Sequence, residues 1–203
     1  MTNLESTVFV VDDDDAVRDS LLDLVDSVGL NVEAFSSAQS FLDSYDPLRP
    51  GCLVLDIRMP GMSGLDLQDR LSEIGSVLPI IFITGHGDIP MAVRAMQRGA
   101  VDFIQKPFRD QELLDRINDA LEKGTRSFEV QEQQAEFATR VKNLTQRERE
   151  VMEMIVNGKA NKVIAIDLGL SQRTVELHRA RVMEKMKART LADLVRMVTK
   201  VIR

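Results

Sequence analysis

The sequence predicts an α/β domain built on a doubly wound, five-stranded parallel sheet, followed by a small all-helical domain. Two observations lead to this fold class. In the first half, short apolar runs that are typical of buried strands alternate five times with stretches whose apolar residues recur every three or four positions, as in helices. After Leu144 only the helical spacing remains. A chain of 203 residues is long enough for two domains with separate cores.

The predicted strands are short and apolar, and each precedes a predicted helix. The run from 8 to 11 is wholly apolar, which is typical of a strand buried on both faces. Cys52 lies beside another apolar run, so we expect a buried strand residue rather than a reactive thiol. The predicted strands are 8–11, 31–35, 53–55, 80–84 and 102–105. The predicted helices are 17–28, 38–44, 65–71, 90–98 and 110–122.

The segment from 124 to 143 has little apolar content and is predicted to be a linker between a domain at 1–123 and a domain at 144–203. Its few apolar residues, such as Phe128 and Phe137, leave open a helical extension of the preceding helix. In the second domain, Thr145 and Glu148 form a capping-box pattern before the helix 146–157. Ser171 is a candidate N-cap. The further helices predicted there are 161–168, 172–186 and 191–201.

The charge of the chain differs in sign between its two parts. Residues 140–203 contain 15 Lys and Arg against 7 Asp and Glu, whereas the rest contains 11 against 25. This asymmetry favours a nucleic-acid partner for the basic part and cations for the acidic part. No apolar run approaches the ~20 residues of a membrane helix, and the first residues lack a secretion-signal pattern. We therefore expect a cytoplasmic protein with no membrane partner.

Polar residues stand at the ends of four predicted strands. Asp12 and Asp13 follow the first strand, Asp56 the third, Thr84 ends the fourth and Lys106 follows the fifth. Carboxyl ends of parallel strands share one edge of the sheet, where ligands bind. Clustered carboxylates repel each other and favour a hard cation such as Mg²⁺. A carboxylate beside Mg²⁺ is a nucleophile for phosphoryl groups, and the hydroxyl and ammonium are suited to holding phosphoryl oxygens.

These residues belong to motifs that resemble the receiver domains of two-component response regulators, most closely the FixJ-like branch. The motifs are VVDDDD at 10–15, DIRMPGMSG at 56–64, ITGHGD at 83–88 and KPF at 106–108. The resemblance covers residues 7–123 and implies a flavodoxin-like receiver fold. It implies that Asp56 accepts phosphate from a sensor histidine kinase. It also implies Mg²⁺ as cofactor, bound directly by Asp13 and Asp56, by Asp12 through water, and by the backbone carbonyl of Arg58.

The same resemblance implies a conformational switch. Thr84 and Lys106 would contact the phosphoryl group, and the rotamer of Phe103 would follow the movement of Thr84. The Lys106–Pro107 peptide bond is expected to be cis. Arg58 and His86 are expected to tune phosphate lifetime, although His86 alternatively serves only as a loop residue.

Residues 144–186 resemble the LuxR-type DNA-binding domain, with 161–168 as scaffold helix and 172–186 as recognition helix of a helix-turn-helix. The helical period predicts Val175, Val182 and Met186 on the core face. On the opposite face, the expected base contacts are Arg173, Glu176, Leu177 and Ala180. The expected phosphate contacts are Lys162, Thr174 and Arg181. Arg179 is expected to pair with Glu148 or Glu150.

Together these features predict a transcriptional regulator of a bacterial two-component system that binds double-stranded DNA under the control of phosphorylation at Asp56. It would not be an enzyme beyond its own phosphorylation and dephosphorylation. A homodimer is expected on phosphorylation, through a face near Val93, Met96 and Ile104, although Met96 alone is a better candidate for the core. Relief of an inhibitory contact between domains is the alternative route, and the last helix serves either the core or the dimer.

Other function classes have weaker support. An aspartate-nucleophile phosphatase needs a second Asp two residues after the nucleophile, where this chain has Arg58. A transcription factor that works without phosphorylation, using a receiver-like dimerisation domain, is a further alternative, although none of the acidic or Lys positions is lost. A simple phosphate sink or protein-binding module would have no use for residues 144–186.

Overall fold

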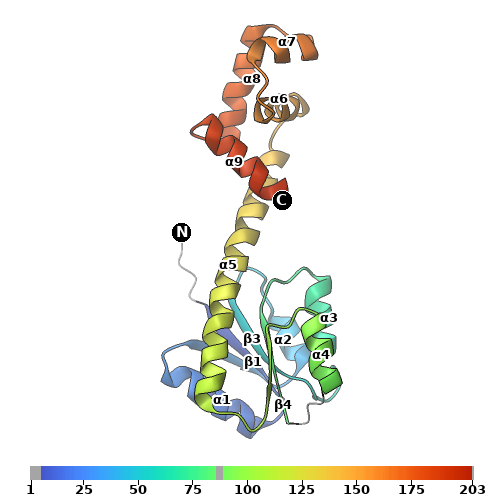
Figure 1. Ribbon diagram of the computed structural model, residues 1–203, viewed down its shortest axis with the longest axis vertical. Helices are drawn as coiled ribbons and strands as arrows, with labels where there is room; N and C mark the ends of the chain where they lie inside the picture. The colour runs from blue at the N-terminus through green and yellow to red at the C-terminus, as the bar shows by residue number, and fades with distance from the viewer. Residues whose placement is uncertain (1–5, 86–88, 203) are drawn as a thin grey trace. The chain divides into compact units, whose positions relative to one another are not determined.

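The computed structural model describes residues 6–85 and 89–202, with side chains up to Thr199. The chain divides into two compact units, residues 1–130 and 131–203. The predicted architecture is confirmed in both: a five-stranded parallel sheet with flanking helices comes first, and a bundle of helices follows (Figure 1).

The sheet of the N-terminal unit has the strand order β2-β1-β3-β4-β5, with every neighbouring pair parallel. The strands are β1 (Thr7–Val11), β2 (Asn31–Phe35), β3 (Gly51–Asp56), β4 (Ile80–Thr84) and β5 (Asp102–Gln105). Every residue of β1, β3 and β4 is buried, which explains their almost purely apolar sequences. The chain changes direction across the sheet between β1 and β3, so the carboxyl ends of these two strands form the topological switch point where ligands bind.

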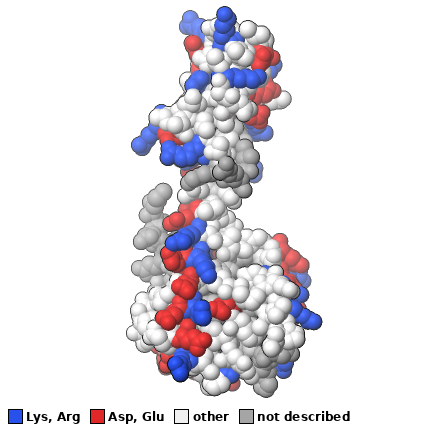
Figure 2. Space-filling view, in the orientation of Figure 1, with Lys and Arg blue, Asp and Glu red and all other residues white. Residues whose placement is uncertain are grey.

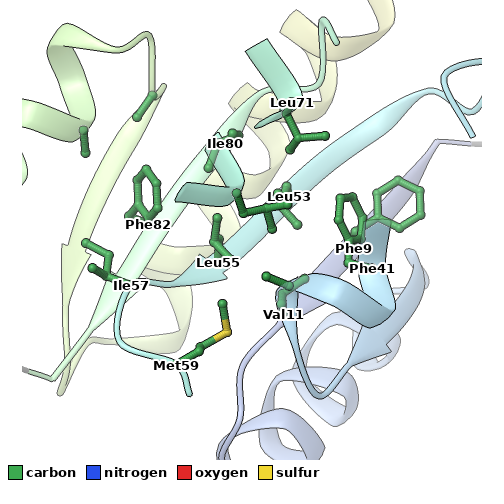
Figure 3. Close-up of a cluster of buried hydrophobic side chains, with 14 residues drawn as sticks. Phe9, Val11, Phe41, Leu53, Leu55, Ile57, Met59, Leu71, Ile80 and Phe82 are labelled. Atoms are coloured by element: carbon green, nitrogen blue, oxygen red, sulfur yellow. The ribbon is translucent and has the colours of Figure 1, made fainter. Parts of the chain in front are cut away.

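Helices cover both faces of the sheet and bury one apolar cluster on each face. The helices are α1 (Asp15–Ser27), α2 (Ala38–Ser44), α3 (Gly64–Glu73), α4 (Ile89–Gln97) and α5 (Asp110–Lys142). The first cluster joins the sheet to α2, α3 and α4, and Figure 3 shows its side chains around Phe82, Leu55 and Phe9. The second cluster joins the other face to α1 and α5 through residues such as Val25 and Ile117. Because helices pack on both faces of the sheet, the ends of the strands are held in fixed positions.

Helix α5 is much longer than the predicted helix 110–122, because it continues through most of the segment predicted to be a linker. Its packing begins in the N-terminal unit, where a Cβ added to Gly124 would lie 2.3 Å from the carbonyl oxygen of Gly51. Only glycine permits this approach of helix to strand. Further along, Phe137 and Val141 pack against the core of the C-terminal unit. The sparse apolar residues of this segment are therefore the contacts of a continuous helix.

The C-terminal unit has a single apolar core formed by α6 (Gln146–Val156), α7 (Asn161–Leu168), α8 (Gln172–Lys185) and α9 (Leu191–Ile202). The predicted capping box is confirmed: the Thr145 hydroxyl accepts a hydrogen bond from the Glu148 N–H, and the Glu148 carboxylate accepts one from the Thr145 N–H. Gly169, in the left-handed conformation at φ 67°, ends α7. Across the described helices, none is long and apolar enough to cross a membrane.

Candidate functional site

Three of the predicted site residues meet at the switch point of the sheet. The ammonium of Lys106, directly after β5, donates to Asp12 Oδ2 at 2.7 Å and to Asp56 Oδ1 at 3.2 Å. Asp12 follows β1 and Asp56 ends β3, and both are almost fully buried. Residues far apart in sequence therefore converge because the parallel sheet brings the ends of β1, β3 and β5 to one edge.

Backbone hydrogen bonds fix the orientation of the two buried carboxylates. The Arg58 N–H donates to Asp56 Oδ2 at 2.6 Å, and the Asp14 N–H donates to Asp12 Oδ1 at 3.0 Å. Behind Asp56, α3 begins at Gly64, where an added Cβ would lie 2.3 Å from the Asp56 carbonyl oxygen. The start of α3 can pack against the end of β3 only because this residue is glycine.

The electrostatics of the site follow from two buried carboxylates that share one ammonium. Burial raises the pKa of Asp56, and although Lys106 lowers it in part, the pKa stays above its ordinary value, with the charge of Asp12 adding to the rise. Burial alone would lower the pKa of Lys106, but its hydrogen bond to Asp12 and the charges of Asp12 and Asp56 outweigh that effect and raise the pKa. Lys106 is thus held as a cation beside a poorly solvated carboxylate.

Thr84 and Phe103, the two residues of the expected switch, lie on the neighbouring strands β4 and β5. Thr84 ends β4 and is buried, and its carbonyl oxygen accepts a hydrogen bond from the Lys106 N–H at 2.8 Å. Phe103 is half-buried and packs against the apolar cluster that contains Phe82. The predicted cis peptide bond between Lys106 and Pro107 is confirmed. His86 lies outside the described residues.

The remaining acidic residues of the first motif have different environments. Asp14 caps α1 by accepting from the Ala16 and Val17 N–H groups, and Asp15 pairs with Arg18 at the surface. Asp13 is exposed. Within the described side chains of 6–85 and 89–199, no three carboxylate, imidazole or thiol groups lie close enough together to hold a metal ion. The structure thus unites Asp12, Asp56 and Lys106, whereas the contribution of Asp13 to a metal site stays a prediction.

Of the three residues predicted near the dimerisation face, Val93 and Met96 are exposed and Ile104 is not. Met96 is 45% exposed, so its assignment to the core is wrong, and Val93 beside it is 46% exposed. Ile104 is buried in the cluster under α1 and α5, so it does not contribute to an exposed face. Alternation along β5 explains the burial of Ile104, since successive side chains point to opposite faces of the sheet.

The two faces predicted for the recognition helix are confirmed in α8. Val175, Val182 and Met186 are fully buried in the core of the C-terminal unit. The exposed side chains are Arg173, Glu176, Leu177, Ala180 and Arg181, and Lys162 on α7 is also exposed, whereas Thr174 is half-buried. Ser171 caps α8 by accepting from the Thr174 N–H. Figure 2 shows Lys and Arg side chains spread over the visible surface of this unit with Asp and Glu among them, and the excess of Lys and Arg in residues 140–203 suits a polyanion.

One predicted ion pair in the C-terminal unit is wrong. Arg179 donates to Asn161 Oδ1 at 3.1 Å and does not pair with Glu148 or Glu150. Glu148, which is buried, instead accepts from Lys185 at 2.6 Å, and Glu150 pairs with Arg147 on its own helix. Arg179 lies almost two turns before Lys185 on α8, so it faces the start of α7 while Lys185 reaches α6.

Sequence reasoning also missed two side chains that bind backbone carbonyls. Gln68 is buried on α3 and donates to the carbonyl oxygens of Ala95 and Arg98 at 3.1 and 3.2 Å, which fastens the end of α4 to α3. Arg140 on α5 donates to the carbonyl oxygen of Met186 at 3.1 Å. Carbonyl partners leave no signal in a sequence, because every residue has one. Only the folded chain reveals them.

Comparison with known families agrees with this architecture. Residues 8–118 match the response regulator receiver domain, and residues 142–198 match the bacterial regulatory proteins of the luxR family. Nodulation protein W of Bradyrhizobium diazoefficiens is 52% identical, with 95% of this chain and 85% of the relative covered. The transcriptional regulatory protein FixJ of Azorhizobium caulinodans is 50% identical, with 94% and 90% covered.

Solved structures of response regulators also match nearly the whole chain. The response regulator StyR superposes with a TM-score of 0.86 at 47% identity, covering 97% of this chain and 99% of the other. Full-length FixJ from B. japonicum has a TM-score of 0.59 at 44% identity, covering 98% of each chain. The chain belongs to the response regulators of two-component systems that join a receiver domain to a LuxR-type DNA-binding domain, and it is a transcriptional regulator of the FixJ-like type.

Proposed function

We propose that Asp56 is the phosphoacceptor, that a sensor histidine kinase is the donor, and that the phosphorylated protein binds DNA through α8. The contact of Lys106 with both Asp12 and Asp56 is the observation that carries this proposal. Each segment of the chain would have its own role: residues 1–123 receive the phosphoryl group, residues 124–143 join the domains and residues 144–203 bind DNA. The protein would act in the cytoplasm, where it meets both the kinase and the DNA.

In the proposed transfer, a carboxylate oxygen of Asp56 attacks the phosphorus of a phosphohistidine. The new P–O bond forms as the P–N bond breaks, and the bonding electrons leave with the imidazole nitrogen. The raised pKa of Asp56 reflects poor solvation of the carboxylate, which leaves its lone pairs more available for attack. The ammonium of Lys106 and the hydroxyl of Thr84 would then bind phosphoryl oxygens, and Lys106 is already kept charged by Asp12.

The donor set suits Mg²⁺, which takes oxygen ligands, keeps several waters and needs only one or two carboxylates from the protein. Asp13 and Asp56 would bind it directly, Asp12 through water and Arg58 through its backbone carbonyl. When bound, Mg²⁺ supplies positive charge that stabilises the phosphoryl oxygens during transfer. Beyond gaining and losing this phosphoryl group, the chain would have no enzymatic activity.

We propose that phosphorylation promotes DNA binding by making the receiver dimerise through α4. Ile89, Val93 and Met96 are 80%, 46% and 45% exposed, an unusual set of large apolar side chains on one short helix. Phosphorylation would draw Thr84 toward the phosphoryl oxygens and let Phe103 turn inward, which changes the surface beside α4. Two paired receivers would bring two copies of α8 to adjacent half-sites of a DNA operator.

The proposal is tested by incubating wild type and Asp56→Asn with radiolabelled acetyl phosphate and then measuring DNA binding by mobility shift. We expect label on the wild type alone, and stronger DNA binding by the labelled protein. Label on the Asp56→Asn variant would identify another acceptor. DNA binding that is equal with and without label would favour the phosphorylation-independent transcription factor.

A further inference from the structure

The recognition helix α8 is held by polar contacts from three different helices. Lys185 donates to Glu148 of α6 at 2.6 Å, and Arg179 donates to Asn161 at the start of α7 at 3.1 Å. The third contact comes from α5, where Arg140 donates to the Met186 carbonyl oxygen at 3.1 Å. The first two contacts lie inside the segment that matches the luxR family, whereas Arg140 precedes that segment.

Arg140 binds the end of α8 where helix carbonyls lack partners. Met186 is the C-cap residue of α8, and its side chain is fully buried. The last carbonyls of a helix have no intrahelical donor and carry partial negative charge, so a guanidinium is a suitable partner. The following residue, Lys187, has a φ of 54°, a conformation that non-glycine residues seldom adopt. A fixed hydrogen bond at Met186 therefore stabilises a helix end that the local sequence favours weakly.

The side chain of Arg140 is itself held in place. Its second terminal nitrogen pairs with Glu136, one turn earlier on α5, and its first nitrogen also lies 3.9 Å from Met197 Sδ on α9. Only 19% of the side chain is exposed. On the same stretch of α5, Phe137 and Val141 pack against the core, and the Val141 carbonyl oxygen accepts from Arg149 at 3.3 Å. In Figure 1 this end of α5 lies against α9.

We propose that Arg140 is a positioning residue for DNA recognition: it fixes the C-terminal end of α8 and thereby the angle at which α8 meets the major groove. The last turns of α5 are then a working part of the DNA-binding domain, although they lie outside the sequence that matches the luxR family. This inference rests on the proposed DNA binding by α8. Arg140 acts through Met186 and not through a contact with DNA.

The test compares Arg140→Met with Arg126→Met in the full-length protein. Arg126 is a matched control, because it forms the same pair with a Glu four residues earlier on the same helix but is 74% exposed. The probe is a DNA duplex that the phosphorylated wild type selects from a random-sequence pool. We expect Arg140→Met to bind this duplex roughly tenfold more weakly, the factor expected for one charge-assisted hydrogen bond, and Arg126→Met to bind as wild type does.

Two further measurements separate positioning from the other roles of an arginine. The slope of log affinity against log salt should be unchanged in Arg140→Met, since a lost phosphate contact would reduce it by about one. The NMR signals of the Met186 and Met197 ε-methyl groups should shift in Arg140→Met and stay fixed in Arg126→Met. Should Arg140→Met fold poorly, Arg140→Lys serves in its place, with partial loss of affinity expected because an ammonium lacks the forked geometry of guanidinium.

The outcomes are distinct. Wild-type affinity in Arg140→Met, or in Arg140→Lys where that replaces it, would overturn the inference while leaving the proposed DNA binding intact. A reduced salt slope would also overturn it, because Arg140 would then be a phosphate ligand. If the wild type selects no duplex at all, the proposed function itself fails.

Discussion

The Lys106 ammonium lies 2.7 Å from Asp12 Oδ2, although the two residues are 94 positions apart in the chain. Asp12 is buried, and Lys106 is its positively charged partner at the edge of the sheet. Because Lys106 also contacts Asp56, one side chain links the proposed metal-binding and phosphoacceptor residues.

Removing the ammonium should lower both the stability of the N-terminal unit and the rate of phosphorylation. In Lys106→Met, two buried carboxylates lose their shared cation, so we expect a loss of roughly 2–3 kcal/mol in the free energy of unfolding of the N-terminal unit. The rate of phosphorylation by acetyl phosphate should fall as well. Lys123→Met, an exposed lysine on α5, is the control. Urea denaturation measures the stability, and a phosphorylation rate equal to that of wild type would show that Lys106 serves structure alone.

The raised pKa of Asp56 predicts a stability cost with a defined pH dependence. Burial favours the protonated carboxyl, so the ionised form destabilises the folded state above the raised pKa, and this cost disappears as pH falls to the ordinary Asp value of about 3.9. Asp56→Asn should therefore unfold at higher urea concentration than wild type near neutral pH, with a difference that shrinks toward about pH 4. Asp26→Asn, which alters an exposed residue on α1, is the control.

The pair of the buried Glu148 and the half-buried Lys185 predicts the opposite pH dependence in the C-terminal unit. The hydrogen bond from Lys185 lowers the pKa of Glu148, so the pair stabilises the fold above the ordinary Glu pKa of about 4.3 and this contribution is lost as pH falls through the lowered value. Glu148→Gln should cost roughly 1–3 kcal/mol near neutral pH and progressively less in acid. Glu150→Gln, whose partner Arg147 is exposed, should cost well under about 1 kcal/mol.

Replacing Gly64 even with alanine should destabilise the fold. Gly64→Ala places a methyl group against the Asp56 carbonyl oxygen, so α3 must shift away from β3 at an expected cost of roughly 1–3 kcal/mol. Gly85→Ala is the control for packing, because no atom of the described residues, its chain neighbours apart, lies within 4 Å of its added Cβ. Thermal unfolding of both variants gives the comparison, and equal midpoints would mean that the start of α3 is not closely packed against β3.

Charge on α4 should block the proposed dimer without harming the fold. Met96→Asp alters a side chain that is 45% exposed, so its unfolding midpoint should match wild type, whereas sedimentation with beryllofluoride should yield a monomer. Gln97→Asp places the same charge on the neighbouring exposed position and should still dimerise if the contact is centred on the apolar residues. A wild-type protein that stays monomeric with beryllofluoride would instead favour relief of an inhibitory contact between the domains.

The sequence predicted the sheet and its site well because both depend on local signals. An all-apolar strand such as β1 has to be buried on both faces, and parallel topology then places Asp12, Asp56 and Lys106 at one edge without further information. The opposite faces of α8 follow equally from helical period.

Three features could not be predicted from the sequence: the length of α5, the partner of Arg179 and the exposure of Met96. Each depends on how elements that are distant in sequence pack together. The length of α5 was underestimated because Gly124, a residue that usually interrupts helices, is here required by the close approach of Gly51. The partner of Arg179 depends on the relative rotation of α7 and α8, which no residue pattern records. The exposure of Met96 likewise depends on how α4 is rotated on the sheet.

The central claim is tested most directly by locating the phosphoryl group chemically. Borohydride reduces an aspartyl-phosphate to homoserine, so the phosphorylated protein can be reduced, digested and sequenced by mass spectrometry. We predict homoserine at position 56, with Asp12 and Asp13 unchanged. Homoserine at either of those two positions, or at none after stoichiometric phosphorylation, would contradict the assignment of Asp56 as the phosphoacceptor.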